Sequence, residues 1–131
     1  MKLKQSEIAI IDDDDLFRKS AVAVLARNLQ KDILSFESGV AALEHLEQNN
    51  SIDIILSDIN MPVMDGLEFL KRVKEKYPDK ICIMMSGYPG NEQTAMNLGA
   101  DAYINKPFST QEIADLMRSL VRLNGGRHCR H

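Results

Sequence analysis

The chain has 131 residues, of which 44% are hydrophobic and 27% are charged, and its formal net charge at pH 7 is −3. This length suits one domain with a sizeable core, and the composition is ordinary for a soluble globular protein. The slightly acidic balance lacks the basic footprint of proteins that bind nucleic acid or an anionic membrane, so neither partner is expected.

The sequence shows no targeting or membrane-spanning segment. No apolar run approaches the roughly 20 residues that cross a bilayer, and residues 1–7 lack the apolar core of a signal peptide. Cys82 lies in an apolar run and Cys129 in a polar tail, and a disulfide between them is not expected in a reducing compartment. These features predict a cytoplasmic protein.

Short apolar runs alternate along the chain with longer stretches of helical periodicity. The first, third and fourth runs are nearly continuous and rich in isoleucine, which is typical of strands covered on both faces. The five runs, each a predicted strand, cover residues 8–11, 33–36, 52–56, 81–85 and 102–104.

Five helices are predicted between and after these strands. Gly99 is a natural C-terminal cap for the fourth helix, and Ser109 or Thr110 can cap the fifth. His45 is expected on the solvated face of the second. The first helix is expected to begin near residues 12–15, and the second to cover about 39–47. The third follows residues 65–66, the fourth covers about 91–98, and the fifth starts at 109 or 110.

Five successive βα units predict one doubly wound, flavodoxin-like α/β domain. Its parallel sheet is expected in strand order 2-1-3-4-5, with helices on both faces. The domain is expected over residues 1–123. Because Gly125 and Gly126 follow the last helix, residues 124–131 are expected to be a flexible tail, a linker remnant or residues added for expression. A zinc site in the tail is disfavoured, because four ordered ligands are not visible.

Polar side chains follow four of the five predicted strands. In a parallel sheet these positions meet at one edge, where open α/β sheets bind their ligands. The sequence therefore predicts one crevice that gathers carboxylates, a hydroxyl and an ammonium group. In chain order its members are Asp12, Asp13, Asp14 and Asp15, then Ser57 and Asp58, then Ser86, then Asn105 and Lys106.

The residue types in this crevice favour magnesium and phosphate chemistry. Clustered carboxylates repel, so some hold protons or a cation joins them. Oxygen ligands without a nearby His or Cys favour Mg²⁺, which often shares its coordination with a phosphate oxygen, and lysine is a compact point charge for phosphate. A carboxylate can also form an aspartyl phosphate. Asp58 is the best candidate nucleophile because it follows the central strand alone.

Each of these residues also has a structural alternative. Asp14 or Asp15 is expected to cap the first helix, and Asp65 is expected to act in a turn and helix start. Ser86 and Lys106, taken singly, could be ordinary loop residues. Their coincidence at four strand ends favours the functional interpretation.

The chain resembles the receiver domain of two-component response regulators over residues 6–123. Four segments carry the resemblance, in order and at strand ends. Ser86, where Thr is commoner, and Gly87, where Ala is more usual, are small departures. The segments are IAIIDDD at 8–14, IILSDINMPVMDG at 54–66, IMMSGY at 83–88 and GADAYINKPF at 99–108.

The resemblance implies a role for each residue of the acidic crevice. Asp58 looks like the phosphoacceptor. Mg²⁺, or Mn²⁺ in its place, would be held by Asp12, Asp13, Asp58 and the backbone carbonyl of Asn60. Of the first pair, Asp13 is implied to be the more direct ligand.

Other residues of the resemblance imply a conformational switch. Ser86 looks like the hydroxyl that bonds the new phosphoryl group, and Lys106 like the lysine that pairs with it. Tyr103 resembles the aromatic residue that turns inward when the hydroxyl moves. Pro107 is implied to follow a cis peptide bond.

The resemblance implies a signalling domain. It is not expected to be an enzyme, although it would assist its own phosphorylation and dephosphorylation. A sensor histidine kinase, a phosphotransfer protein or a small phosphodonor would supply the phosphoryl group. The surface of the fourth helix, fifth strand and fifth helix would then bind a downstream output domain or protein, or a second copy of the chain. Direct nucleic-acid binding and membrane association are not expected of this domain.

Two alternatives remain open from the sequence. One is a receiver-like binding module that is never phosphorylated. The other is a Mg²⁺-dependent aspartyl-phosphate phosphatase of the haloacid dehalogenase type, which uses a second acid two positions after its nucleophile. The chain has Asn60 at that position.

Overall fold

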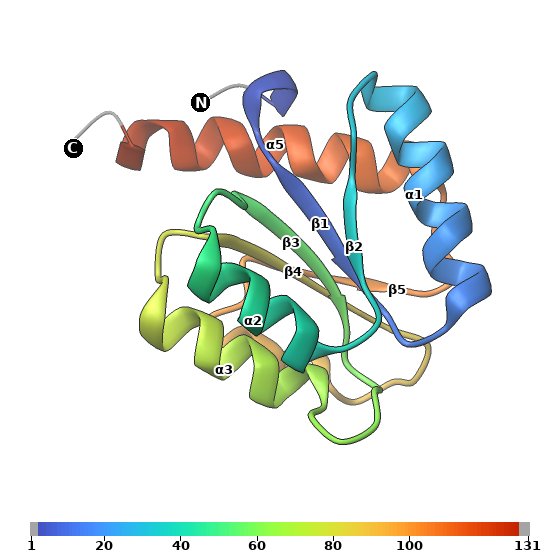
Figure 1. The fold of residues 1–131 in the computed structure, drawn as a ribbon, viewed down its shortest axis with the longest axis vertical. Helices are drawn as coiled ribbons and strands as arrows, with labels where there is room; N and C mark the ends of the chain where they lie inside the picture. Colours follow the sequence, from blue (N-terminus) through green and yellow to red (C-terminus); the bar gives the residue numbers. More distant parts are fainter. Residues whose placement is uncertain (1–2, 129–131) are drawn as a thin grey trace.

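The computed structural model describes residues 3–128 and shows five βα units after a short 3₁₀ turn, Leu3–Gln5 (Figure 1). The strands are β1 (Ile8–Ile11), β2 (Leu34–Phe36), β3 (Ile54–Asp58), β4 (Ile81–Ser86) and β5 (Ala102–Asn105). The helices are α1 (Asp15–Leu29), α2 (Gly39–Gln48), α3 (Gly66–Lys76), α4 (Glu92–Asn97) and α5 (Thr110–His128).

The five strands form one parallel sheet in the order β2-β1-β3-β4-β5, which confirms the predicted topology. Figure 1 shows α1 and α5 over one face of the sheet and α2 and α3 over the other. The parallel direction places the carboxyl ends of all five strands at one edge.

Strand β1 is apolar without interruption because both of its faces are buried. Ile8 and Ile10 face the core beneath α1 and α5, whereas Ala9 and Ile11 face the core beneath α2 and α3. All four side chains are completely buried. Burying an isoleucine contributes about 1.5–3 kcal/mol, so both faces of the central sheet stabilise the fold.

Side-chain caps fix where the helices begin. The expected roles of Asp14 and Asp65 are confirmed, because each accepts a hydrogen bond from the amide three residues later, at 3.1 and 2.9 Å. Ser109 and Glu112 form a reciprocal capping box at α5, with bonds of 3.0 and 3.1 Å. These caps hold the helix starts next to the carboxyl edge of the sheet.

Three strands end later than the sequence predicts, and β5 does so by one residue, at Asn105. Asp58 and Ser86 are the last residues of β3 and β4, where the sequence places them just after the strands. The ladder continues because Asp58 pairs in register with Met85 and the amide of Ile59 donates to the Met85 carbonyl at 3.0 Å. Both polar side chains are therefore held by sheet backbone.

Helix α5 also continues past the predicted end of the domain. It runs to His128, so residues 124–128, expected in the tail, have helical backbone, and 129–131 lie outside the described residues. Each glycine costs about 1 kcal/mol relative to alanine in a helix, which weakens a helix end without forbidding it. The domain boundary at residue 123 stays a prediction.

His45 is not on a solvated face, contrary to the expectation. Its ring packs on Phe36 with the ring centroids 5.1 Å apart, and its Nε2 is buried with no hydrogen-bond partner among residues 3–128. The reason is that α2 lies against the edge strand β2, so this position of the helix faces the strand.

Candidate functional site

The carboxyl ends of β1, β3 and β5 bring the predicted charged residues together. Carboxylate oxygens of Asp12, Asp13 and Asp58 all lie within 4.8 Å of one another. The Lys106 ammonium is 2.8 Å from Asp12 Oδ2 and 3.6 Å from Asp58 Oδ1. A nucleophile candidate, two further acids and one cation thus share a single crevice.

Asp12 is completely buried, and every one of its polar atoms has a partner. Its amide donates to the Phe36 carbonyl at 3.1 Å, and its carbonyl accepts from Arg18 Nη1 at 2.6 Å. Its Oδ1 accepts from the amide of Asp14 at 2.9 Å, and its Oδ2 accepts from Lys106. A side chain held in this way is rigid and partly neutralised.

Asp13 differs from its neighbour, because its side chain is exposed. Within residues 3–128 it has no hydrogen bond or ion pair to the rest of the chain. Its carboxylate oxygens are therefore free to bind a cation beside Asp58.

Burial raises the pKa of Asp58 above its ordinary value, although the Lys106 ammonium acts in the opposite direction. The charges of Asp12 and Asp13 raise this pKa further, and a backbone hydrogen bond from Asn60 lowers it. Positive charge brought into the crevice would therefore favour the ionised carboxylate. Three carboxylates with oxygen donors alone fit Mg²⁺ in this crevice.

Lys106 is positioned by an aromatic ring as well as by carboxylates. Its ammonium lies 4.2 Å from the centroid of the Phe17 ring, within range of a cation–π interaction. Phe17 packs edge-on against Phe108 with the centroids 6.0 Å apart. The Lys106–Pro107 peptide bond is cis, as the resemblance implies.

Ser86 lies in a hydrogen-bond network at the end of β4. Its hydroxyl accepts from Asn60 Nδ2 and from the amide of Tyr88, both at 3.0 Å, and donates to the Tyr88 carbonyl at 3.1 Å. The Tyr103 hydroxyl donates to the same carbonyl at 3.3 Å. The Ser86 hydroxyl thus connects the loop after Asp58 to Tyr88, and the Tyr88 carbonyl connects this network to Tyr103 of β5.

Gly66 lets helix α3 approach the backbone of the candidate nucleophile. A Cβ at this position would lie 2.2 Å from the Asp58 carbonyl oxygen and 2.6 Å from the Ile59 Cα. The Gly66 amide donates to the Ile59 carbonyl at 2.7 Å. The predicted turn therefore also fixes the position of Asp58.

Sequence reasoning missed two residues of this site. One is Arg18, whose position three residues after Asp15 is the signal for a pair on one helix face. It is 8% exposed and bonds to Asp12 and Asp15. Phe17 lies at helical spacing with Ala21 and Leu25, a pattern that indicates only a place in the core beneath the first helix. The hydrogen bond and charge of Arg18 hold the pKa of Asp15 below its usual range.

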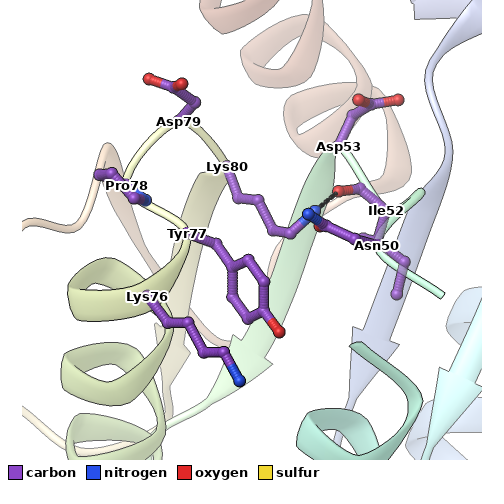
Figure 2. Close-up of a pocket in the computed structure, with 8 residues that line it drawn as sticks. All are labelled: Asn50, Ile52, Asp53, Lys76, Tyr77, Pro78, Asp79 and Lys80. Carbon is purple, nitrogen blue, oxygen red and sulfur yellow. Dashed lines mark hydrogen bonds between the residues drawn. The ribbon is translucent and has the colours of Figure 1, made fainter. Parts of the chain in front are cut away.

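A cavity lies at the opposite, amino-terminal edge of the strands. This cavity of about 290 Å³ contains the buried Lys80, whose ammonium donates to the Ile52 carbonyl (Figure 2). The Tyr77 ring lies within 5.4 Å of that ammonium and 5.6 Å of the Lys76 ammonium. The cavity is separate from the acidic crevice, because it lies at the other end of β3 and β4.

No helix in the described part of the chain is both long enough and apolar enough to cross a membrane.

The family model that matches this chain describes the response regulator receiver domain and covers residues 8–118. The chain is 32% identical over 124 residues to a chemotaxis protein CheY homolog of Campylobacter jejuni, covering 92% of this chain and 95% of that protein. It is 35% identical over 105 residues to the transcriptional regulatory protein FlgR of Helicobacter pylori, covering 80% of this chain but only 27% of that protein.

Solved structures agree with the sequence relatives. A CheY-like response regulator receiver domain protein from Methanospirillum hungatei is 26% identical, with a TM-score of 0.84 and coverage of 93% of this chain and 98% of that one. A receiver domain protein from Clostridium thermocellum is 25% identical, with a TM-score of 0.83 and coverage of 92% and 97%. With the acidic crevice at the carboxyl edge of a five-stranded parallel sheet, these matches show that the chain belongs to the response regulator receiver domain family.

Proposed function

We propose that Asp58 accepts a phosphoryl group from a phosphohistidine of a sensor kinase or phosphotransfer protein, or from a small phosphodonor. The observation that carries this proposal is the meeting of three carboxylates within 4.8 Å, with an ammonium 3.6 Å from Asp58. Asp12, Asp13 and Asp58, with the backbone carbonyl of Asn60, would hold Mg²⁺ or Mn²⁺.

The transfer requires positioning and charge neutralisation rather than a general base. A carboxylate oxygen of Asp58 forms a bond to phosphorus while the bond from phosphorus to the donor breaks. The leaving atom, which is the nitrogen of a phosphohistidine or the oxygen of an acyl phosphate, keeps the electron pair. Bound Mg²⁺ supplies positive charge to the phosphoryl oxygens. Lys106 starts close to both Asp12 and Asp58, so a small movement brings its ammonium to the phosphoryl group.

The output is a shift between two conformations. In the described conformation the Ser86 hydroxyl bonds to Asn60 and Tyr88. A phosphoryl group on Asp58 competes for this hydroxyl, which would release the Tyr88 carbonyl that Tyr103 also contacts. The surface of α4, β5 and α5 would then change its affinity for a partner.

The relatives support a signalling role for such a surface. They include chemotaxis proteins, the transcriptional regulatory protein FlgR and the sensor kinase CckA of Brucella abortus, in which the matched part is 12% of the protein. For this chain the proposal is a cytosolic receiver that binds a kinase or phosphotransfer protein and an output domain or protein. A phosphorylation-dependent homodimer is part of the same proposal.

A phosphatase is disfavoured by the position two residues after Asp58. Asn60 cannot donate a proton as a carboxylic acid does, and its amide bonds to Ser86 at 3.0 Å. Hydrolysis of p-nitrophenyl phosphate should therefore be no faster with this protein than with its Asp58→Asn variant.

Beryllofluoride, which imitates a phosphoryl group on a carboxylate, tests the proposal. We expect Mg²⁺-dependent bound resonances in ¹⁹F NMR spectra, lost in Asp58→Asn. They should persist in Asp79→Asn, which changes an exposed acid at the opposite edge of the sheet. Absence of bound resonances in the parent protein would favour a binding module that is not phosphorylated.

A further inference from the structure

The connection between β1 and α1 contains a buried cation that the proposed chemistry does not use. Arg18 is 8% exposed, which is rare for arginine unless it is paired. Its Nη1 donates to the carbonyl of Asp12 at 2.6 Å, and its Nη2 donates to the carboxylate of Asp15. The guanidinium thus ties the residue after β1 to the first residue of α1.

The position of this tie determines what it can control. The carbonyl that Arg18 holds belongs to the peptide unit between Asp12 and Asp13, so the bond fixes the direction in which Asp13 leaves the backbone. The Asp12 carboxylate is already held by Lys106 and by the amide of Asp14. Asp13 has no such partner in the described part of the chain, so only the backbone can orient it.

Electrostatic repulsion makes such a tie necessary. Residues 12–15 are four successive aspartates, and like charges at this spacing repel. The guanidinium neutralises one of them, Asp15, while it holds the backbone of another, Asp12. A loop without this cation would separate the carboxylates that now lie within 4.8 Å.

We propose that Arg18 is a positioning residue for the magnesium site, because it orients the Asp12–Asp13 peptide so that the Asp13 carboxylate faces Asp58 before the cation binds. The inference rests on the proposed function, in which these carboxylates hold Mg²⁺. Groups that orient metal ligands without touching the metal commonly change metal affinity by about 10–100-fold.

Charge and positioning predict opposite effects for this residue. If Arg18 acted only as a positive charge near the crevice, its removal would tighten Mg²⁺ binding. If it orients Asp13, its removal weakens Mg²⁺ binding, even though the repulsion between the guanidinium and Mg²⁺ is also removed. The sign of the change in Mg²⁺ affinity therefore distinguishes the two roles.

The chain offers a matched control in Lys74. Its ammonium also joins a backbone carbonyl, that of Lys80 at 2.7 Å, to a carboxylate, that of Asp101 at 2.9 Å. These partners lie at the amino-terminal edge of β4 and β5, away from the acidic crevice. Lys74→Met removes a comparable tie without touching the β1–α1 connection.

The experiment titrates each full-length protein with magnesium chloride and follows backbone amide shifts by ¹H–¹⁵N NMR, with thermal unfolding as a check on folding. We expect the Mg²⁺ dissociation constant of Arg18→Met to rise about tenfold or more, and that of Lys74→Met to stay at the parent value. Arg18→Lys, which keeps the charge but not the planar fork, should fall between parent and Arg18→Met; it decides the outcome if Arg18→Met does not fold.

An unchanged or lower dissociation constant in the folded arginine variants would overturn the positioning role, while Mg²⁺ binding by the parent leaves the proposed function intact. An equal rise in Lys74→Met would also overturn it, because general loss of stability would then explain the effect. Absence of Mg²⁺ binding in the parent would overturn the proposed function and the role of Arg18 together.

Discussion

Four successive aspartates follow strand β1, and the structure gives them four different environments. Asp12 is buried and fully bonded, Asp13 is exposed and free of partners within residues 3–128, Asp14 caps α1, and Asp15 pairs with Arg18. The sequence predicts an acidic pair followed by a cap, but it cannot divide the roles further. That division depends on contacts with Lys106 and Arg18. Lys106 is distant from strand β1 in sequence, and Arg18 lies within the first helix, where its spacing does not indicate these contacts.

Substitution of the first two aspartates should separate metal binding from stability. Asp13→Asn should weaken Mg²⁺ binding at least tenfold, with little change in stability, because its side chain is exposed and bonds to no other described residue. Asp12→Asn should also lower the free energy of unfolding, by about 1–3 kcal/mol, because it weakens a partly buried hydrogen bond to Lys106. Mg²⁺ titration and urea unfolding measure the two effects; equal destabilisation by both variants would contradict the assignment.

Val63 is a strained residue on the loop after β3. Its φ is +68° and its side chain is fully exposed, and this left-handed conformation costs about 1–2 kcal/mol for residues with a Cβ. Asparagine tolerates the conformation, and no packing is lost on replacement. Val63→Asn should therefore raise the free energy of unfolding by about 0.5–1 kcal/mol. Urea unfolding measures it, and a decrease would show that the valine makes stabilising contacts.

At the scale of elements, the sequence predicts every strand and helix, but not the sites where tertiary contacts override local pattern. The runs of isoleucine locate β1, β3 and β4 because both faces of these strands are buried. The ends of β3 and β4 were misplaced, since the ladder between neighbouring strands decides them. His45 was misplaced because the direction of α2 relative to β2 is not encoded in helical periodicity.

The connection between β4 and β5 provides a prediction for signal output. Ser86→Ala should leave phosphorylation of Asp58 intact, because the hydroxyl is no ligand of the nucleophile in the described network. It should reduce the phosphorylation-dependent amide shifts of α4, β5 and α5, and Tyr103→Phe should reduce them less. A coupling of about 1–3 kcal/mol corresponds to a change of roughly 5–150-fold in partner affinity. Unchanged shifts in Ser86→Ala would contradict this route.

At the scale of the whole molecule, the two edges of the sheet have different chemistry. The carboxyl edge gathers Asp12, Asp58, Ser86 and Lys106, whereas the amino-terminal edge holds Lys80 against the Ile52 carbonyl (Figure 2). This asymmetry follows from the parallel topology, and the sequence predicts it once the five strands are identified. Val63, Arg18 and the cavity at the far edge were not predicted, because backbone strain and burial depend on three-dimensional packing.

Cys82 reports on the integrity of the sheet between these edges. Burial raises the pKa of its thiol to about 12, so the folded protein at pH 8 contains almost no thiolate at this position. In a Cys129→Ser background, a thiol-specific reagent should react with Cys82 much more slowly in buffer than in urea. The unfolded thiol ionises near its ordinary pKa of 9.0. Cys82 therefore contributes to the free energy of unfolding below pH 9.0, and this contribution is lost as the pH rises toward 12. Rapid labelling of the folded protein would contradict its burial.

Acceptance of the phosphoryl group on Asp58 is the central claim, and chemical mapping of the modified residue tests it most directly. The protein is incubated with Mg²⁺ and a small acyl phosphate as phosphodonor. The aspartyl phosphate formed on the protein is reduced with borohydride, and the modified peptides are identified by mass spectrometry. We predict modification at Asp58, dependent on Mg²⁺ and absent from Asp58→Asn, with Asp79→Asn behaving like the parent. Modification at another residue, or equal labelling of Asp58→Asn, would contradict the account.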